Sequence, residues 1–210
     1  MATMTMGREF DVVSSDRSLG RNLPQRLGRV LWAPMLLMAL MGFAAGFVVA
    51  ILRANEVADG GSADTIEAMR HVVAGLMFIG FAAVFAAISF AIARILGEFR
   101  KGGGDLQEAV GGSVETLKMP VTAKAFIALM MMAMMAILAA VVLHFVFAAD
   151  VEATEASLAT SEERFLVLEA VRRVGVGMYL FSILLGLATI IQVLRFQAQR
   201  IRAVASEQTS

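Results

Sequence analysis

The chain contains two histidines, His71 and His144, and each lies near one end of a long apolar stretch. Imidazole ligates haem iron and other metals, and it exchanges protons near neutral pH. An ionisable group at membrane depth is costly to bury, which makes it a functional candidate. Three roles stay open: the two axial ligands of a single haem, proton or ion handling, and a neutral imidazole that hydrogen-bonds to a neighbouring helix. A bundle with two haems would need four histidines.

Five methionines form a second group with metal-binding chemistry, at 130–132, 134 and 135. Thioether sulfur selects Cu(I). Met135 lies nine positions before His144, which is about 13 Å along a helix and on its opposite side. No single metal is therefore ligated by this histidine and these methionines. A copper site made of thioethers alone is the alternative to methionine as an adaptable packing residue. The other methionines available to such a site are Met35, Met38 and Met41.

Composition excludes several kinds of chemistry. The chain has no cysteine, which removes disulfides, thiol catalysis and iron–sulfur ligation. Its formal net charge is zero, so no global field points to nucleic acid. We find no nucleophile–base pair or acidic pair that can be assembled within the apolar segments, and an enzyme is the weakest interpretation.

Four apolar blocks must position these residues, at about 31–52, 72–93, 121–149 and 174–194. Each is near or above the roughly 20 residues that a helix needs to cross a bilayer core. A spanning segment must satisfy its backbone groups without water, so each block is predicted to be helical. The fold class is therefore an all-α, integral membrane four-helix bundle.

Sequence signals place the starts of three helices. Asn22 with Pro24 fits a cap followed by a proline in the first turn. The sequences DTIE, residues 64–67, and TSEE, residues 160–163, fit capping motifs. The second helix is thus predicted to begin near 65 and the fourth near 161.

The distribution of basic residues predicts the orientation. Thirteen of the 18 lie in the N-terminal tail, the 94–124 connection or the C-terminal tail. Basic residues favour the cytoplasmic side, so both termini are predicted to be cytoplasmic. Arg172 and Arg173 fall on the other side, where Glu169 is spaced to pair with both.

Three regions follow along the chain. Residues 1–29 form a polar cytoplasmic segment that ends in a short amphipathic lead-in at the membrane interface. Residues 30–198 form the four-helix membrane domain, and 199–210 form a cytoplasmic tail. Two glycine clusters predict that the 94–124 connection is flexible.

Small residues at spacing four predict where the helices pack, because membrane helices associate through close backbone approach. Gly42 and Gly46 form a GxxxG, which we expect to receive a partner helix or a second protomer. The remaining predicted packing positions are Ala83, Ala87, Ala136, Ala140, Ser182 and Gly186.

The favoured function is a non-catalytic accessory or scaffold subunit that packs into a larger membrane complex, or into a homo-oligomer. The alternatives are a haem- or metal-binding protein that uses His71 and His144, and a small channel or transporter. Arginine far outnumbers lysine, and alanine and glycine are abundant. On that composition we expect a multi-pass protein of a bacterial inner membrane. The expected partners are the lipid bilayer and other membrane subunits, without nucleic acid.

Overall fold

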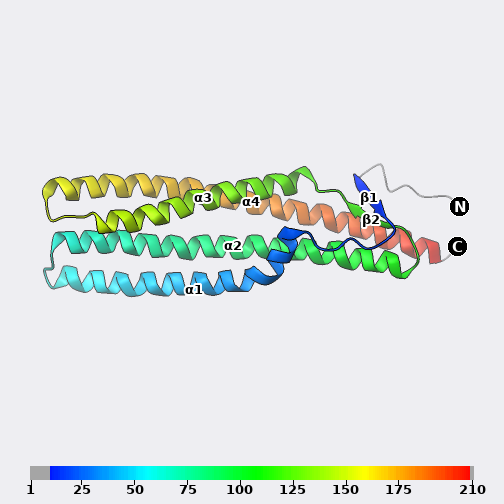
Figure 1. Ribbon diagram of the computed structural model, residues 1–210, viewed down its shortest axis with the longest axis horizontal. Coiled ribbons are helices and arrows are strands. Elements are labelled where there is room, and N and C mark those ends of the chain that lie inside the picture. The colour runs from blue at the N-terminus through cyan, green and yellow to red at the C-terminus, as the bar shows by residue number, and fades with distance from the viewer. Residues whose placement is uncertain (1–9, 209–210) are drawn as a thin grey trace. The chain divides into compact units, whose positions relative to one another are not determined.

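The computed structural model describes residues 10–208, which form four α-helices and two short β-strands (Figure 1). The helices are α1 (Leu23–Ala58), α2 (Ala63–Ala109), α3 (Val121–Ala149) and α4 (Glu155–Gln208), and the strands are β1 (Val12–Ser15) and β2 (Val114–Leu117). Each helix is long and apolar enough to cross a membrane. The predicted all-α architecture of four membrane-length helices is confirmed, and the two strands are an addition to it.

A reciprocal capping box fixes the start of α1, as the sequence predicted. The Asn22 side-chain oxygen accepts a hydrogen bond from the Gln25 N–H at 3.1 Å, and Gln25 Oε1 accepts one from the Asn22 N–H at 3.0 Å. This arrangement satisfies two of the N–H groups that a helix start leaves free. Pro24 lies in the first turn, where its missing N–H costs nothing.

The fourth helix begins earlier than predicted. Thr154 Oγ1 accepts a hydrogen bond from the Ser157 N–H at 3.2 Å, and α4 starts at Glu155. The predicted start near 161 was wrong, because Thr154 supplies an earlier cap. Ser161 consequently lies inside α4, where its side chain is buried.

The glycine-rich connection is also different from the prediction. Helix α2 continues to Ala109 and includes Gly102–Gly104, so the expected flexible segment is largely helical. A Cβ on Gly103 would collide with Gln197 and Arg200 of α4, and one on Gly104 would lie 2.8 Å from Ser18 Oγ. Glycine here allows close packing, and those contacts outweigh its low helix propensity.

The strands join the N-terminal segment to the α2–α3 connection. They pair antiparallel and lie side by side (Figure 1), with Val12 opposite Leu117 and Ser15 opposite Val114. Next to this pairing, Lys118 Nζ lies 2.9 Å from Asp11 Oδ2. The N-terminal segment is thus held by main-chain hydrogen bonds before α1 begins.

The chain divides into two compact units. Unit 1 consists of the chain up to Trp32, Ile88–Ile127 and the chain from Ser182. Unit 2 consists of Ala33–Ala87 and Ala128–Phe181, and it contains both histidines.

In unit 2, the GxxxG of α1 packs against α2 of the same chain. A Cβ on Gly42 would lie 2.9 Å from the backbone nitrogen of Gly80, and one on Gly46 would lie 3.2 Å from Met77 Cε. We expected a partner helix at this seam, but the chain fills it with its own second helix. The close approach of two glycines is the usual reason for such a motif.

The other predicted packing positions are mostly buried. In unit 2, Ala83, Ala87 and Ala140 are buried and Ala136 is half-buried. In unit 1, Ser182 and Gly186 are buried, and a Cβ on Gly186 would meet Ile92 of α2 and Phe126 of α3.

The methionine run of α3 faces mainly outward. Met131, Met132 and Met135 are exposed, as suits side chains that contact lipid tails. Met134 is half-buried, and its sulfur lies 3.2 Å from the Tyr179 hydroxyl, which donates to it.

Candidate functional site: a buried histidine pair

The two histidines, 73 residues apart in sequence, contact each other directly. His71 Nδ1 of α2 lies 3.0 Å from His144 Nδ1 of α3, within hydrogen-bonding distance. Both side chains have an exposed fraction of 0%. The sequence placed both histidines at the same end of the predicted membrane domain, and the structure brings them into one site.

Two residues that the sequence analysis did not assign to the site extend this pair. Ser161 Oγ of α4 lies 2.9 Å from His71 Nε2 and donates to Glu67 Oε1 of α2 at 3.1 Å. Glu67 also forms an ion pair with Arg70 at 3.2 Å. The order is thus His144, His71, Ser161 and Glu67, and it ties α2, α3 and α4 together.

The chemistry of each group sets the direction of the protons along this chain. An ion-paired carboxylate only accepts hydrogen bonds, so the Ser161 hydroxyl proton points to Glu67. Ser161 must then accept from His71, which carries its proton on Nε2. A neutral His71 therefore accepts at Nδ1, and His144 donates to it from its own Nδ1. Every hydrogen bond in the chain points towards Glu67.

The end of this hydrogen-bonded series opposite Glu67 is a hydrogen-bond acceptor without a partner. With its proton on Nδ1, a neutral His144 presents a lone pair at Nε2. This atom is buried, and no polar group of residues 10–208 lies within hydrogen-bonding distance of it. A buried polar atom without a partner is uncommon, and each case calls for an explanation.

Aromatic rings enclose the pair. The Phe165 ring lies 5.4 Å from the His71 ring and 5.5 Å from the His144 ring, centroid to centroid. Phe78 meets His144 edge-on at 4.9 Å, and Phe147 meets His71 at 6.1 Å. These rings keep the imidazoles in apolar surroundings, which disfavour a fixed positive charge there.

Charged side chains lie around this aromatic shell. On α2, Glu67 and Arg70 act on His71 through their charge, and the Arg70 guanidinium lies 3.9 Å from the Phe165 ring centroid. From α4, the Arg164 guanidinium lies 4.7 Å from the Phe147 ring centroid, and that of Arg172 lies 5.1 Å from the Phe78 ring centroid.

The predicted pairing of Glu169 with two arginines is confirmed. Glu169 forms an ion pair with Arg172, and Arg173 Nε lies 3.5 Å from its carboxylate. This carboxylate offsets part of the positive charge that α4 presents near the histidines.

Outside the predicted apolar blocks, to which our expectation of no nucleophile–base pair was limited, a hydroxyl and an imidazole approach each other at Ser161 and His71. Ser161 was missed because its sequence signal fits a helix cap. Its hydroxyl proton is nevertheless committed to Glu67 instead of His71, and its side chain is buried.

The two Nδ1 atoms are too close to ligate one metal ion from opposite sides as they stand. Metal–imidazole bonds are about 2.0–2.1 Å long, so two nitrogens on opposite sides of one ion lie about 4 Å apart. The observed separation is 3.0 Å. Axial ligation of a haem by His71 and His144 would thus require the rings to separate, and it stays a prediction.

No group of three or more His, Cys, Asp or Glu side chains in the described residues is placed to share a metal ion.

No known protein family, curated protein or solved structure matches this chain, so the interpretation of the site rests on its own geometry.

Proposed function

We propose that this protein is a multi-pass membrane protein. It passes protons along the series of hydrogen-bonded side chains that leads from His144 to Glu67. One observation carries the proposal: a continuous set of hydrogen bonds runs from a buried free acceptor to a carboxylate. Chains of ionisable groups inside membrane proteins commonly serve as proton relays.

The relay proceeds by the shift of one proton at each step. A proton that reaches His144 Nε2 allows His144 to release its Nδ1 proton to His71 Nδ1. His71 then releases its Nε2 proton to Ser161, and Ser161 releases its hydroxyl proton to Glu67. Both imidazoles and the hydroxyl end neutral, and Glu67 ends as a neutral carboxylic acid, so no imidazolium remains inside the aromatic shell.

Glu67 is the exit of this relay. Its side chain is 15% exposed, and its carboxylate pairs with Arg70. Solvent therefore reaches Glu67 more easily than it reaches the histidines, and protons exchange there. On the predicted orientation, Glu67 lies at the outer end of the membrane domain. The relay then forms the outer part of a proton path across the membrane.

Proton flux into liposomes tests this proposal. Purified protein is reconstituted with a pH-sensitive dye inside, and a potassium gradient with valinomycin sets the membrane potential. We expect flux above that of empty liposomes, and we expect Ser161→Ala to abolish it because alanine interrupts the chain. Ser161→Thr retains the hydroxyl and should restore flux. Wild-type flux equal to that of empty liposomes would overturn the proposal, as would full flux in Ser161→Ala.

A second candidate is an accessory subunit of a larger complex in a bacterial inner membrane. Its support is the apolar surface of α1, since only 17% of the most apolar stretch of this helix is buried. Large exposed side chains on this helix include Leu37, Leu40 and Phe47. Lipid tails and neighbouring helices are equally suited to cover these apolar side chains. Mild-detergent purification at native expression, followed by mass measurement of the intact particle, tests the candidate: a single chain contradicts it, and a stable hetero-complex supports it.

A further inference from the structure

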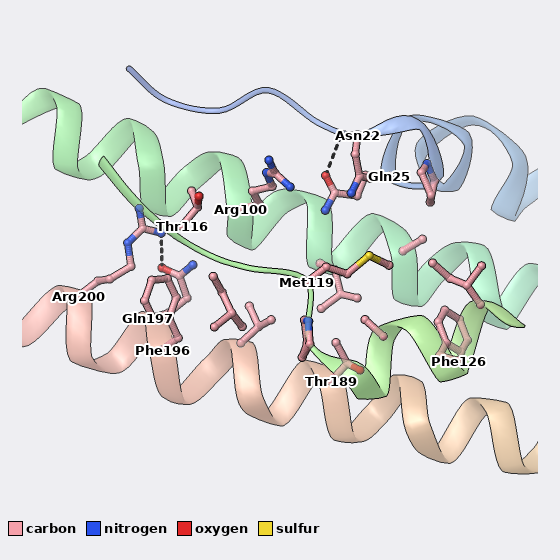
Figure 2. Close-up of a pocket in the computed structure, with 18 residues that line it drawn as sticks. Asn22, Gln25, Arg100, Thr116, Met119, Phe126, Thr189, Phe196, Gln197 and Arg200 are labelled. Carbon is pink, nitrogen blue, oxygen red and sulfur yellow. Dashed lines mark hydrogen bonds between the residues drawn. The ribbon is translucent and has the colours of Figure 1, made fainter. Parts of the chain in front are cut away.

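Unit 1 contains a pocket that the proton relay does not use. It has a volume of about 120 Å³ and is lined by the start of α1, the later part of α2, the β2–α3 connection and the adjoining turns of α3 and α4 (Figure 2). Its size is close to that of a cavity that holds one benzene molecule, about 150 Å³. The pocket thus accommodates a small group or a few methylenes.

The two ends of this pocket differ in polarity. Phe126 lies at one end in Figure 2, and Arg200 lies at the other. The apolar lining residues include Phe126, Ala123 and Val193, and the hydroxyl-bearing Thr189 also lines the pocket. The three apolar residues belong to segments predicted to lie in or at the edge of the membrane, whereas Arg200 lies beyond the predicted spans.

Two arginines give the polar end a positive charge. Arg100 extends from α2 and Arg200 from α4 (Figure 2). Arg200 is 1% exposed, and its guanidinium donates to the neutral oxygens of Gln107 and Gln197. Arg100 Nε is buried without a hydrogen-bond partner. Neither arginine forms an ion pair with a carboxylate of residues 10–208.

Nearby acidic residues of the described chain form no ion pair with these two arginines. The charge of Glu115 offsets part of that of Arg200, but Glu115 does not line the pocket. Glu98 is paired with Arg21 at 2.6 Å, and Glu108 accepts a hydrogen bond from the Ser18 N–H. Arginines without an ion-paired carboxylate favour an anionic ligand, since a guanidinium binds phosphate in a bidentate geometry.

We propose that this pocket binds an anionic glycerophospholipid from the bilayer leaflet at this end of the protein. Its phosphate would lie against Arg100 and Arg200, and the first part of an acyl chain would lie against Phe126. The rest of the lipid would remain in the bilayer. Basic pockets between membrane helices bind anionic headgroups in this way.

The apolar lining and the charge favour this occupant over two others. Met119, which lines the pocket, is 44% exposed, and Leu23, beside the lining residues at the start of α1, is 69% exposed, so exposed apolar side chains lie next to the pocket. A free phosphate ion gains nothing from these apolar side chains. A zwitterionic lipid would place its own cation beside the two arginines.

Native mass spectrometry of the detergent-purified full chain tests the proposal. Phosphatidylglycerol and phosphatidylcholine are titrated separately, and bound lipid is counted at each concentration. We expect tighter binding of phosphatidylglycerol, and we expect Arg100→Gln to weaken it about fivefold, as the loss of one arginine contact predicts. Arg195→Gln is the matched control, because Arg195 is exposed on α4 and does not line the pocket.

Two further arms make each outcome decisive. Ala123→Leu fills the apolar end without a change of charge and should also weaken binding, with folding checked by circular dichroism. Inorganic phosphate, compared with chloride at equal ionic strength, should not displace the lipid. Equal binding of the two lipids, equal effects of Arg100→Gln and Arg195→Gln, unchanged binding by folded Ala123→Leu, or displacement by phosphate would each overturn the proposal.

Discussion

Replacing Ser161 with alanine should destabilise the protein through one orphaned donor. Ser161 accepts from His71 Nε2 and donates to Glu67, so Ser161→Ala removes both hydrogen bonds. Glu67 keeps its ion pair with Arg70, but the His71 N–H stays buried without an acceptor. An unsatisfied buried group costs about 1–3 kcal/mol. Hydrogen bonds between membrane helices average about 0.6 kcal/mol, which places the expected cost towards the low end of that range.

Thr160 provides the matched control. Its side chain is exposed and donates to the carbonyl of Ala156 in its own helix, so Thr160→Ala orphans no buried group. Alanine also has the higher helix propensity, and we expect a change in stability near zero or slightly favourable.

A double-mutant cycle isolates the hydrogen bond itself. In a His71→Phe background the donor is absent, and Ser161→Ala should cost less than it does in the wild type, because both partners are then apolar. Reversible unfolding by sodium dodecyl sulfate in mixed micelles, followed by circular dichroism, gives the free energies. A cost for Ser161→Ala equal to that of Thr160→Ala, or equal in both backgrounds, would refute this reasoning.

Three further predictions concern packing, cofactors and topology. Gly42→Ala should destabilise the protein by about 1–3 kcal/mol, because its Cβ would lie 2.9 Å from the Gly80 backbone. Gly177 has open space around it, so Gly177→Ala should not destabilise. Equal unfolding free energies of the two variants would contradict the packing. If the haem prediction is correct, purified protein shows a haem absorption band that His71→Gln and His144→Gln both abolish, and a colourless wild type contradicts it. Single cysteines at positions 58, 108 and 156 should react with an impermeant thiol reagent in intact cells only at 58 and 156, if both termini are cytoplasmic; labelling at 108 alone reverses the orientation.

Much of the helical architecture could be predicted because membrane spans depend on local composition. Long apolar blocks leave a helix as the only single-segment solution, and Asn22 with Pro24 gives a local start signal. The strands could not be found in this way, since β1 and β2 pair across about a hundred residues and each is only four residues long. Gly102–Gly104 were misassigned for a related reason: close packing with α4 and the N-terminal segment makes glycine favourable there, and neither contact is visible locally.

The site was only half predictable. Histidine is rare in this chain, so His71 and His144 stood out by type, and their positions placed them at one end of the membrane domain. Their direct contact depends on which faces of α2 and α3 meet, which helix–helix packing decides. Glu67 and Ser161 each belong to a sequence that fits a helix cap, and that interpretation concealed their role. The spacing of Glu67 from His71, and of Ser161 from Thr154, would have placed each side chain within a helix. It would not have shown that the two side chains face each other across two helices.

The direction of the hydrogen-bond chain can be measured directly by ¹⁵N NMR of histidine-labelled protein in lipid. The chain has two histidines, so four ring nitrogens cover the whole imidazole signal. We predict protons on His71 Nε2 and His144 Nδ1, a bare His144 Nε2, and a scalar coupling between the two Nδ1 atoms across their hydrogen bond. Spectra of His71→Gln and His144→Gln assign the signals. Absence of that coupling in folded protein, or a proton on His144 Nε2 with none on its Nδ1, would contradict a chain that points from His144 to Glu67.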